Sequence, residues 1–165
     1  MKKILAILFI LLSVSAINGQ QNATWKVSKK IAVDNFHSLV VKNSVTVMLI
    51  EDAADDSIRI EGDEKFVNDV KVFQLGKTII VSGKDYSGLQ KKGTVYIPVR
   101  SLHDLQVNSS AKVISYNTLQ SPVLNLMING TCTVDLMLNG KLNIRESEGY
   151  DFTWQRIYQT KQPSL

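Results

Sequence analysis

Apolar residues occupy every second position over much of the chain, which is the pattern of β-strands that bury one face. The alternating segments are residues 39–49, 58–60, 70–72, 79–81 and 95–99. Clusters of glycine, proline, aspartate and asparagine separate them, and these residues favour turns. Only residues 63–69 could form one short helical turn. We therefore expect an all-β domain of many short strands.

One alternating pattern occurs three times. Residues 36–49, 102–115 and 123–136 superpose without gaps, and a weaker fourth copy begins at Leu142. The superposition aligns four apolar columns: Leu39, Leu105 and Leu126; Val41, Val107 and Ile128; Val45, Ala111 and Cys132; Val47, Val113 and Val134. A unit of about 20 residues suits one coil of a parallel β-helix, which buries its apolar side by stacking on neighbouring coils. Chance similarity between alternating segments is the alternative.

The dipeptide Asn129-Gly130 bears on this interpretation, because Asn-Gly between alternating segments usually predicts a two-residue hairpin. Such a type I′ turn needs positive φ at both central residues. The aligned positions carry Asn108-Ser109 and Lys42-Asn43, so a single copy has the hairpin sequence. We predict a corner between two short strands here. Equivalent residues of successive copies are then expected side by side on parallel strands.

Small and polar corners between alternating strands are also typical of the head GIN domain family of auto-transporter adhesin-like proteins, which this chain resembles. The resemblance covers residues 33–148, with corners at 108–111 and 129–132, an opening strand at 36–49 and a hairpin at 73–83. It implies a right-handed single-stranded β-helix with a hairpin-rich N-terminal part. It implies surface adhesion or lipid-like ligand binding, and it brings no catalytic residues and no cofactor. Family members usually continue through more coils, so we expect a short or truncated member.

The first 19 residues have the layout of a bacterial secretory signal peptide. Lys2 and Lys3 precede an unbroken apolar run over residues 4–12, and Ala16 and Gly19 offer cleavage positions. The run is shorter than the roughly 20 residues of a membrane-spanning helix. An uncleaved anchor helix is the alternative. We expect residues 20–149 to form one exported domain and residues 150–165 a C-terminal tail, without stable membrane insertion after cleavage.

Charge and cysteine content narrow the classes of partner. The chain has 19 Lys and Arg against 15 Asp and Glu, and two of the lysines belong to the predicted signal peptide. The small remaining excess of positive charge does not predict a nucleic-acid partner. The single cysteine, Cys132, excludes an internal disulfide framework. Packing and backbone pairing must therefore stabilise the fold.

Three groups of residues could carry chemistry, and each has a simpler structural interpretation. His37 and His103 occupy equivalent positions, but no third ligand column accompanies them, so we expect solvated histidines and no metal. Cys132 shares a column with aliphatic residues and is expected to be a small interior side chain. The acidic residues 51–56 lack the alternating carboxylates of a calcium loop and are expected to form a solvated loop.

No arrangement of catalytic residues is visible. Between residues 100 and 149, the acids Asp104, Asp135, Glu146 and Glu148 fall at unmatched positions of the copies, so no carboxylate pair is expected. There is also no Ser-His-Asp ordering and no phosphate-binding glycine loop. We therefore expect a protein that is not an enzyme, in which Asn108 and Asn129 form a structural amide ladder.

The tail contains an aromatic row, in which Tyr150, Phe152 and Trp154 alternate. The interpretation that we prefer is a cap, because an open terminal coil would expose a sheet edge to aggregation. In the alternative, the row is exposed and stacks on sugars or contacts a partner. Tyr150, Phe152 and Trp154 are then the predicted ligand-binding residues.

The expected function is that of an exported, adhesin-like domain of the cell envelope that binds carbohydrate, protein or matrix. One alternative is a periplasmic protein that binds a small molecule or lipid, and a weaker one is a degenerate carbohydrate-active enzyme. The expected partner is a surface glycan or protein, and the expected location is the periplasm, the outer-membrane surface or the extracellular space. A lipid binder would need a continuous apolar pocket of several hundred Å³.

Overall fold

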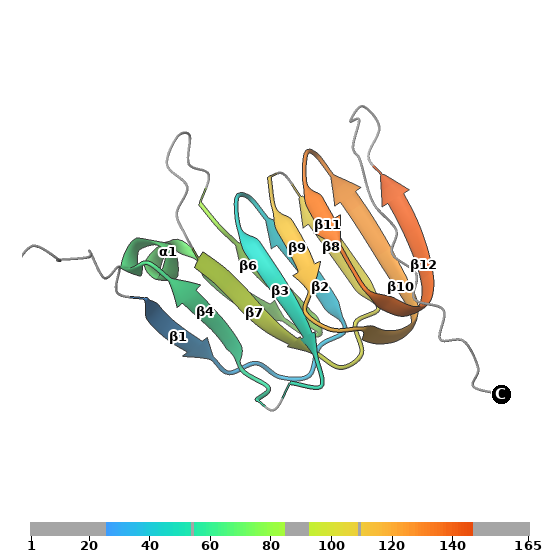
Figure 1. The fold of residues 1–165 in the computed structure, drawn as a ribbon, viewed down its shortest axis with the longest axis horizontal. Helices are drawn as coiled ribbons and strands as arrows, with labels where there is room; N and C mark the ends of the chain where they lie inside the picture. The colour runs from blue at the N-terminus through green and yellow to red at the C-terminus, as the bar shows by residue number, and fades with distance from the viewer. Residues whose placement is uncertain (1–25, 54, 85–92, 109, 147–165) are drawn as a thin grey trace, which may run out of the picture.

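The computed structural model describes residues 26–53, 55–84, 93–108 and 110–146. These residues form twelve strands and one short helix, so the predicted all-β class is confirmed. The strands make two six-stranded sheets that lie face to face (Figure 1).

The first sheet has the strand order β1-β4-β7-β3-β9-β11. Its strands are β1 (Val27–Ile31), β4 (Ile58–Gly62), β7 (Gly93–Val99), β3 (Thr46–Glu51), β9 (Lys112–Ser115) and β11 (Thr133–Asp135). The second sheet has the order β12-β10-β8-β2-β6-β5. Its strands are β12 (Leu138–Glu146), β10 (Leu119–Asn129), β8 (Asp104–Asn108), β2 (Ser38–Lys42), β6 (Thr78–Ser82) and β5 (Lys71–Leu75).

Parallel pairing holds most of both sheets together. It joins β7, β3, β9 and β11 in the first sheet and β6, β2, β8, β10 and β12 in the second. The antiparallel pairs among the described strands, β1–β4, β4–β7 and β5–β6, lie toward the other end of the sheets. The β5–β6 pair is the hairpin predicted within residues 73–83, and Gly76 has a φ of 58° in its turn.

The aligned sequence copies lie side by side in the register that their columns predict. Leu105 pairs with Leu39 on one side and with Leu126 on the other, in parallel. In the first sheet, Val113 pairs with Val47 and with Val134. Each apolar column is therefore a row of like side chains that crosses neighbouring strands.

The segment at Asn129-Gly130 is a corner, as predicted. The chain leaves β10 in the second sheet at Asn129 and enters β11 in the first sheet at Thr133, so no hairpin forms. Gly130 has a φ of 95°, and Asn43, at the aligned position, has a φ of 63°. Glycine and asparagine tolerate this left-handed backbone better than other residues do.

The finer prediction of a right-handed single-stranded β-helix is not confirmed. The described strands form two separate sheets, and neither sheet closes on itself. Antiparallel strands also make up the β1–β4–β7 region and the β5–β6 edge. The structure is an all-β fold in which the apolar columns cross neighbouring parallel strands.

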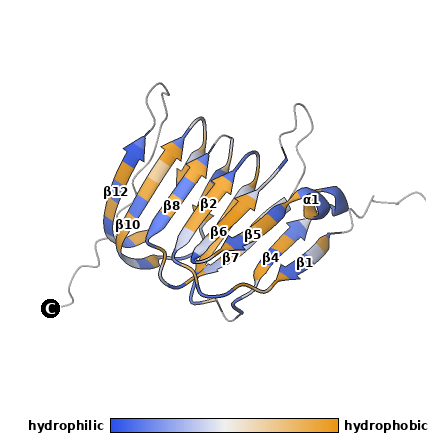
Figure 2. Ribbon diagram, turned by 180° about the vertical axis from the view of Figure 1, so that it is seen from behind, coloured by the Kyte–Doolittle hydropathy of each residue, from blue (hydrophilic) through white to orange (hydrophobic). Residues whose placement is uncertain are grey.

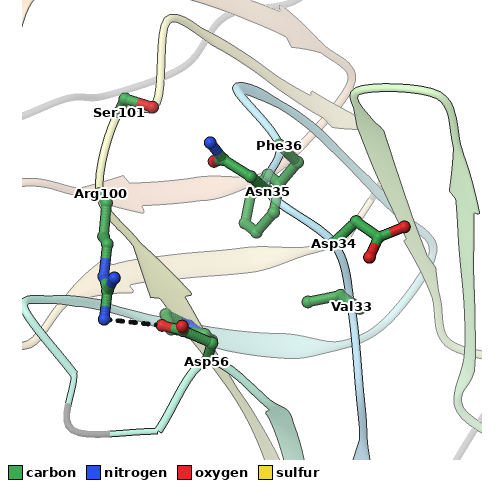
Figure 3. Close-up of a pocket in the computed structure, with 8 residues that line it drawn as sticks. Val33, Asp34, Asn35, Phe36, Asp56, Arg100 and Ser101 are labelled. Atoms are coloured by element: carbon green, nitrogen blue, oxygen red, sulfur yellow. Dashed lines mark ion pairs between the residues drawn. The ribbon is translucent and has the colours of Figure 1, made fainter.

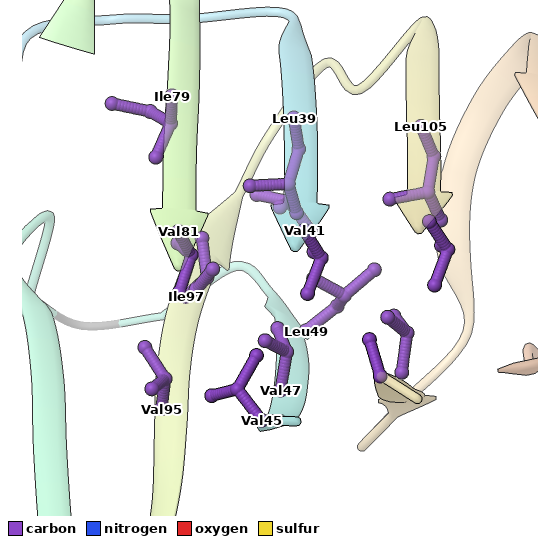
Figure 4. Close-up of a cluster of buried hydrophobic side chains, with 14 of the residues drawn as sticks. Leu39, Val41, Val45, Val47, Leu49, Ile79, Val81, Val95, Ile97 and Leu105 are labelled. Carbon is purple, nitrogen blue, oxygen red and sulfur yellow. The ribbon is translucent and has the colours of Figure 1, made fainter. Parts of the chain in front are cut away.

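Aliphatic side chains pack the space between the two sheets into one core cluster. Figure 4 shows side chains of β2, β6 and β8 meeting those of β3 and β7. The largest fully buried side chains are Leu39, Leu49, Ile58, Ile60, Ile79, Ile97, Leu105, Leu119, Leu124, Val41, Val47 and Val81. Every second position of the strands therefore supplies this interior, as the alternating pattern predicts.

The short helix α1 (Glu64–Asp69) confirms the helical turn predicted at residues 63–69. Asp63 caps its N-terminus, because the Asp63 side chain accepts a hydrogen bond from the Phe66 backbone N–H. The helix lies against β1 and β4 at one end of the sheets (Figure 1). No helix in the described ranges has the length and apolar character that a membrane crossing requires.

Candidate functional site

The outer face of the second sheet carries two regular rows of side chains. Successive side chains of a strand point to opposite faces, so the residues between the core columns point outward. One row consists of Ser38, Asp104, Asn125 and Asn143, and the next row consists of Val40, Gln106, Met127 and Arg145. Figure 2 turns this sheet toward the viewer and shows hydrophilic and hydrophobic residues alternating along its strands.

These two rows line an open hollow of about 310 Å³ on the outer face. The first row is a hydrogen-bonded ladder: Asn143 Nδ2 donates to Asn125 Oδ1 at 3.0 Å, and Asn125 Nδ2 donates to Asp104 Oδ1 at 3.0 Å. Because strands in a sheet lie about 4.7–4.9 Å apart, the ladder presents one polar group at that interval. The hollow therefore has one wall of evenly spaced polar groups, namely the Ser38 hydroxyl, the Asp104 carboxylate and the amides of Asn125 and Asn143.

A second ladder lies on the other side of the Met127 row. Asn129 Nδ2 donates to Asn108 Oδ1 at 2.8 Å, which confirms the amide ladder predicted from the aligned corners. Gln106 Nε2 also donates to Asn108 Oδ1, at 3.1 Å. These hydrogen bonds hold the amide side chains in fixed orientations on both sides of the row.

The hollow combines an apolar floor with polar groups that can bind a ligand. Met127 is 39% exposed, and Val40 lies in the same row. A side-chain amide has two N–H donors and two acceptor lone pairs. Asn125 uses one donor and one lone pair within the ladder, so its amide can form further hydrogen bonds with a ligand. Arg145 adds an exposed cation on β12. Such a combination of apolar contact with a few oriented polar groups is typical of small-ligand and sugar sites.

Residues 35–153 match the family described as "Putative auto-transporter adhesin, head GIN domain". The match covers most of the chain. This chain belongs to that head GIN domain family. None of the curated proteins is significantly similar to it.

Solved structures share the fold of this head GIN domain. A "putative adhesin" of Bacteroides fragilis has a TM-score of 0.60 at 17% identity, over 75% of this chain and 59% of its own. A "putative adhesin" of Parabacteroides merdae has a TM-score of 0.57 at 22% identity, over 73% and 52%. A "putative lipid binding protein" of Parabacteroides distasonis has a TM-score of 0.56 at 11% identity, over 73% and 59%. The chain therefore spans little more than half of these proteins, and the likeness shows the fold alone.

The two histidines of the head GIN domain stack on each other in the segments that precede β2 and β8. The ring centroids of His37 and His103 lie 5.8 Å apart, with an interplanar angle of 27°. The His103 backbone N–H donates to the His37 carbonyl oxygen at 2.8 Å. Both side chains are exposed, as predicted. In the described part of the chain, no three His, Cys, Asp or Glu residues come together as a metal site would need.

Cys132 is half-buried and packs against the core cluster, in line with its place in the column of Val45 and Ala111. Burial raises the pKa of the Cys132 thiol. The thiolate is the reactive form of cysteine, so this environment disfavours reactivity. A structural role as a small, nearly interior side chain accounts for the residue.

A second hollow of about 340 Å³ lies beside the segment that precedes β2 (Figure 3). Arg100 and Asp56 face each other in it, with Arg100 Nη2 2.8 Å from Asp56 Oδ1. Both side chains are more than half exposed, so this ion pair contributes little to stability. Because the two charges compensate each other, this hollow offers a ligand less than the outer face of the second sheet does.

One acidic residue differs from the expected solvated loop. The side chain of Glu51 is buried, with only 7% of the residue exposed. Its Oε2 atom accepts a hydrogen bond from the Gln120 backbone N–H at 3.1 Å. Burial raises the pKa of the Glu51 carboxyl, the Gln120 hydrogen bond opposes this rise, and the charge of Asp52 adds to it. Sequence alone did not indicate that the backbone N–H of Gln120, distant along the chain, donates to this carboxyl.

Replacing Glu51 with glutamine is expected to stabilise the protein near neutral pH. Because folding raises the pKa of this carboxyl above its ordinary value of 4.5, its contribution favours the native state fully below that value. The contribution is lost as the pH rises through the raised pKa. Glutamine stays uncharged and keeps an oxygen that can accept from the Gln120 N–H.

Thermal unfolding of the Glu51→Gln variant and the wild type at pH about 7 and about 4 measures this effect. The variant should unfold at the higher temperature at neutral pH, and the difference should shrink at acidic pH. Glu146→Gln, at an exposed carboxylate of β12, controls for the change in net charge. A difference of the same size at both pH values would contradict the assigned role of burial.

The predicted ligand-binding residues Tyr150, Phe152 and Trp154 lie outside the described residues, as does the predicted signal peptide, residues 1–19. The outward rows were not predicted as a site. The sequence does contain a signal for these rows. The alignment that forms the leucine column also places Ser38, Asp104 and Asn125 in one polar column. That column becomes a wall of the hollow when the strands pair.

Proposed function

We propose that this head GIN domain is an exported, adhesin-like module that binds a surface glycan through the outer face of β2, β8, β10 and β12. The observation that carries the proposal is the hollow in which the hydrogen-bonded row of Asp104, Asn125 and Asn143 flanks the Met127 row. An extended polysaccharide carries hydroxyl groups at regular intervals. The row offers one polar side chain on each strand, at a regular interval of about 4.8 Å, and sugar rings can lie on the apolar side chains of the next row.

A binding role rather than hydrolysis is part of this proposal. Asp104 is the one acidic side chain among the residues that line the hollow. Glycoside hydrolysis normally uses two carboxylates that flank the scissile bond. The degenerate carbohydrate-active enzyme is therefore the less favoured interpretation of this face.

Lipid binding is the second candidate, because a protein of similar fold from Parabacteroides distasonis carries the description "putative lipid binding protein". In this chain, aliphatic side chains pack the space between the sheets. A lipid bound inside would have to displace them, whereas a glycan on the outer face would not. Surface binding is therefore the better supported function.

The proposal also includes export of the domain and a β-helical winding of the aligned copies. The predicted signal peptide at residues 1–19 would carry the domain to the periplasm, the outer-membrane surface or the extracellular space. The parallel columns that join Leu39, Leu105 and Leu126 support a short β-helical winding of the copies. Such a stack would present the outer face as a stiff, straight surface.

A glycan array followed by titration of the best ligand tests the function. Met127→Ala and Arg145→Ala should each weaken binding about tenfold or more, which corresponds to about 1.4 kcal/mol. Both side chains are exposed on the outer face, so their removal should leave the fold intact. Lys112→Ala, at an exposed position of β9 in the other sheet, is the matched control and should bind as the wild type does.

Two outcomes would overturn the proposal. One is an array without any bound glycan, which would favour a protein or matrix partner. The other is glycan binding that Met127→Ala and Arg145→Ala leave unchanged. If Trp154→Ala alone abolished binding, the tail residues Tyr150, Phe152 and Trp154 would be the contact surface instead.

A further inference from the structure

The Met127 row of the hollow continues beyond β2 onto β6 and β5. Strand pairing aligns Val40 with Ile80 and Ile80 with Phe73. The row therefore crosses all six strands of the second sheet, from Phe73 on β5 to Arg145 on β12 (Figure 2). At about 4.8 Å from strand to strand, the row is about 24 Å long.

The β5 end of this row is apolar and exposed. Phe73 is 59% exposed and Leu75 is 75% exposed. The side chain of Val72 packs against the core cluster, so the next side chain, Phe73, points to the outer face. Ile80 and Val40 are half-buried beside it. An exposed aromatic ring next to aliphatic side chains gives a flat apolar surface on which a sugar ring can stack.

Positive charge borders the same row. Lys71 and Lys42 both pair with Ser82, one from each side, so the two lysines lie in the next outward row. Arg145 ends the Phe73 row at β12, and all three cationic side chains are exposed. The third neighbouring row is the ladder row of the hollow. Across these three rows, the described strands supply three cations and a single carboxylate, Asp104.

We propose that the glycan bound by this face is a uronate-containing acidic polysaccharide, which lies across the strands along the row from Phe73 to Arg145. This proposal rests on the glycan-binding function proposed above and specifies its substrate class. The faces of the sugar rings contact Phe73 and Met127. The sugar carboxylates accept charge-assisted hydrogen bonds from Lys42, Lys71 and Arg145.

Two properties of the face favour this ligand over a neutral glycan or a protein. The excess of cations over the single carboxylate attracts an anionic chain and repels a cationic one. The rows also place one outward side chain on each strand at a constant spacing. A polymer of repeating units can meet such equivalent groups on successive strands, whereas the side chains of a folded protein partner have no such period.

Titration of the wild-type protein with uronate hexasaccharides tests the substrate class. The probes are hexasaccharides of polygalacturonate, alginate, hyaluronan and heparosan, each compared with its methyl ester, which keeps the rings and loses the negative charge. At least one acid should bind about tenfold more tightly than its ester. Its affinity should fall as the salt concentration rises, because salt screens exposed charges.

Equal affinity for acid and ester, or no binding of any of the four acids, would overturn the acidic class. Neutral glycans bound on the array would in that case leave the proposed glycan-binding function intact. An array without any bound glycan would overturn the function and the substrate class together.

The Phe73→Ala variant tests the length of the row. It should weaken binding of the hexasaccharide about tenfold, and binding of the trisaccharide much less, since the shorter chain can bind without reaching β5. Tyr116→Ala is the matched control, because Tyr116 is 67% exposed and follows β9 of the first sheet. An unchanged affinity of Phe73→Ala for the hexasaccharide would overturn the extension of the site to β5.

The double variant Lys42→Gln with Lys71→Gln tests the charged border. It should weaken binding of the acidic hexasaccharide about fivefold or more, reduce its salt dependence and leave binding of the ester unchanged. Lys29→Gln with Lys112→Gln is the matched control, because it changes the net charge equally at exposed positions of the first sheet. Equal losses in the two double variants would overturn the assignment of the two lysines to the site.

Discussion

Replacing Leu105 with alanine is expected to lower the free energy of unfolding by about 2–5 kcal/mol. Leu105 is 1% exposed and lies between Leu39 and Leu126 in one of the apolar columns. Truncation removes buried apolar contacts and leaves a cavity, which the paired strands on both sides cannot easily close. Since domains are stable by only about 5–15 kcal/mol, this is a large share of the total.

Urea denaturation followed by circular dichroism measures the loss. Gln106→Ala, at the next residue of β8, is the matched control because its side chain points to the outer face. It removes one hydrogen bond to Asn108 and should cost less than about 1.5 kcal/mol. Equal losses in the two variants would contradict the inward and outward assignment of these positions.

A second large effect is expected for Gly140→Ala, which should destabilise the protein by about 2–4 kcal/mol. The register of β10 against β12 shifts between Gln120 and Val123, so Ser121 and Pro122 lie opposite Gly140 in a β-bulge. Gly140 has a φ of 149°, and a β-carbon there would overlap the carbonyl oxygen of Ser121. Steric overlap and backbone strain therefore act together.

A shift of Ser121 away from the added methyl group would cost free energy, because Ser121 is buried and its Oγ donates to the Leu102 carbonyl oxygen at 2.7 Å. Lys141→Ala, at the adjacent exposed position of β12, provides the comparison and should cost less than about 0.5 kcal/mol. Thermal or urea unfolding of both variants measures the difference. Similar stabilities would show that the bulge can relax around an added methyl group.

Much of the fold could be predicted from the sequence because its information is local or repeated. Alternation at Leu39 and Val41 determines which side chains face inward, since strand geometry has a period of two. The gapless copies then place Leu105 between Leu39 and Leu126, because parallel stacking brings equivalent positions together. The same reasoning predicted the corner at Gly130 and the amide ladder of Asn108 and Asn129.

The candidate site was predicted only in part. The polar column of Ser38, Asp104 and Asn125 is present in the aligned sequence. It forms the wall of a hollow only together with Asn143 and Arg145, which β12 supplies by pairing with β10. That strand belongs to a weaker sequence copy. Glu51 shows the same limit, because a residue 69 positions away supplies its hydrogen bond.

The sequence by itself therefore determined the all-β class, the inward columns and their register. Tertiary structure alone decided how the strands divide between the two sheets and which strands pair in the antiparallel direction. β4 lies between β1 and β7, and β6 pairs with β5 on one side and β2 on the other. Alternation carries no information on such choices, because a strand with one apolar face can pair in either direction. Only the packing of both sheets around a shared core selects one arrangement.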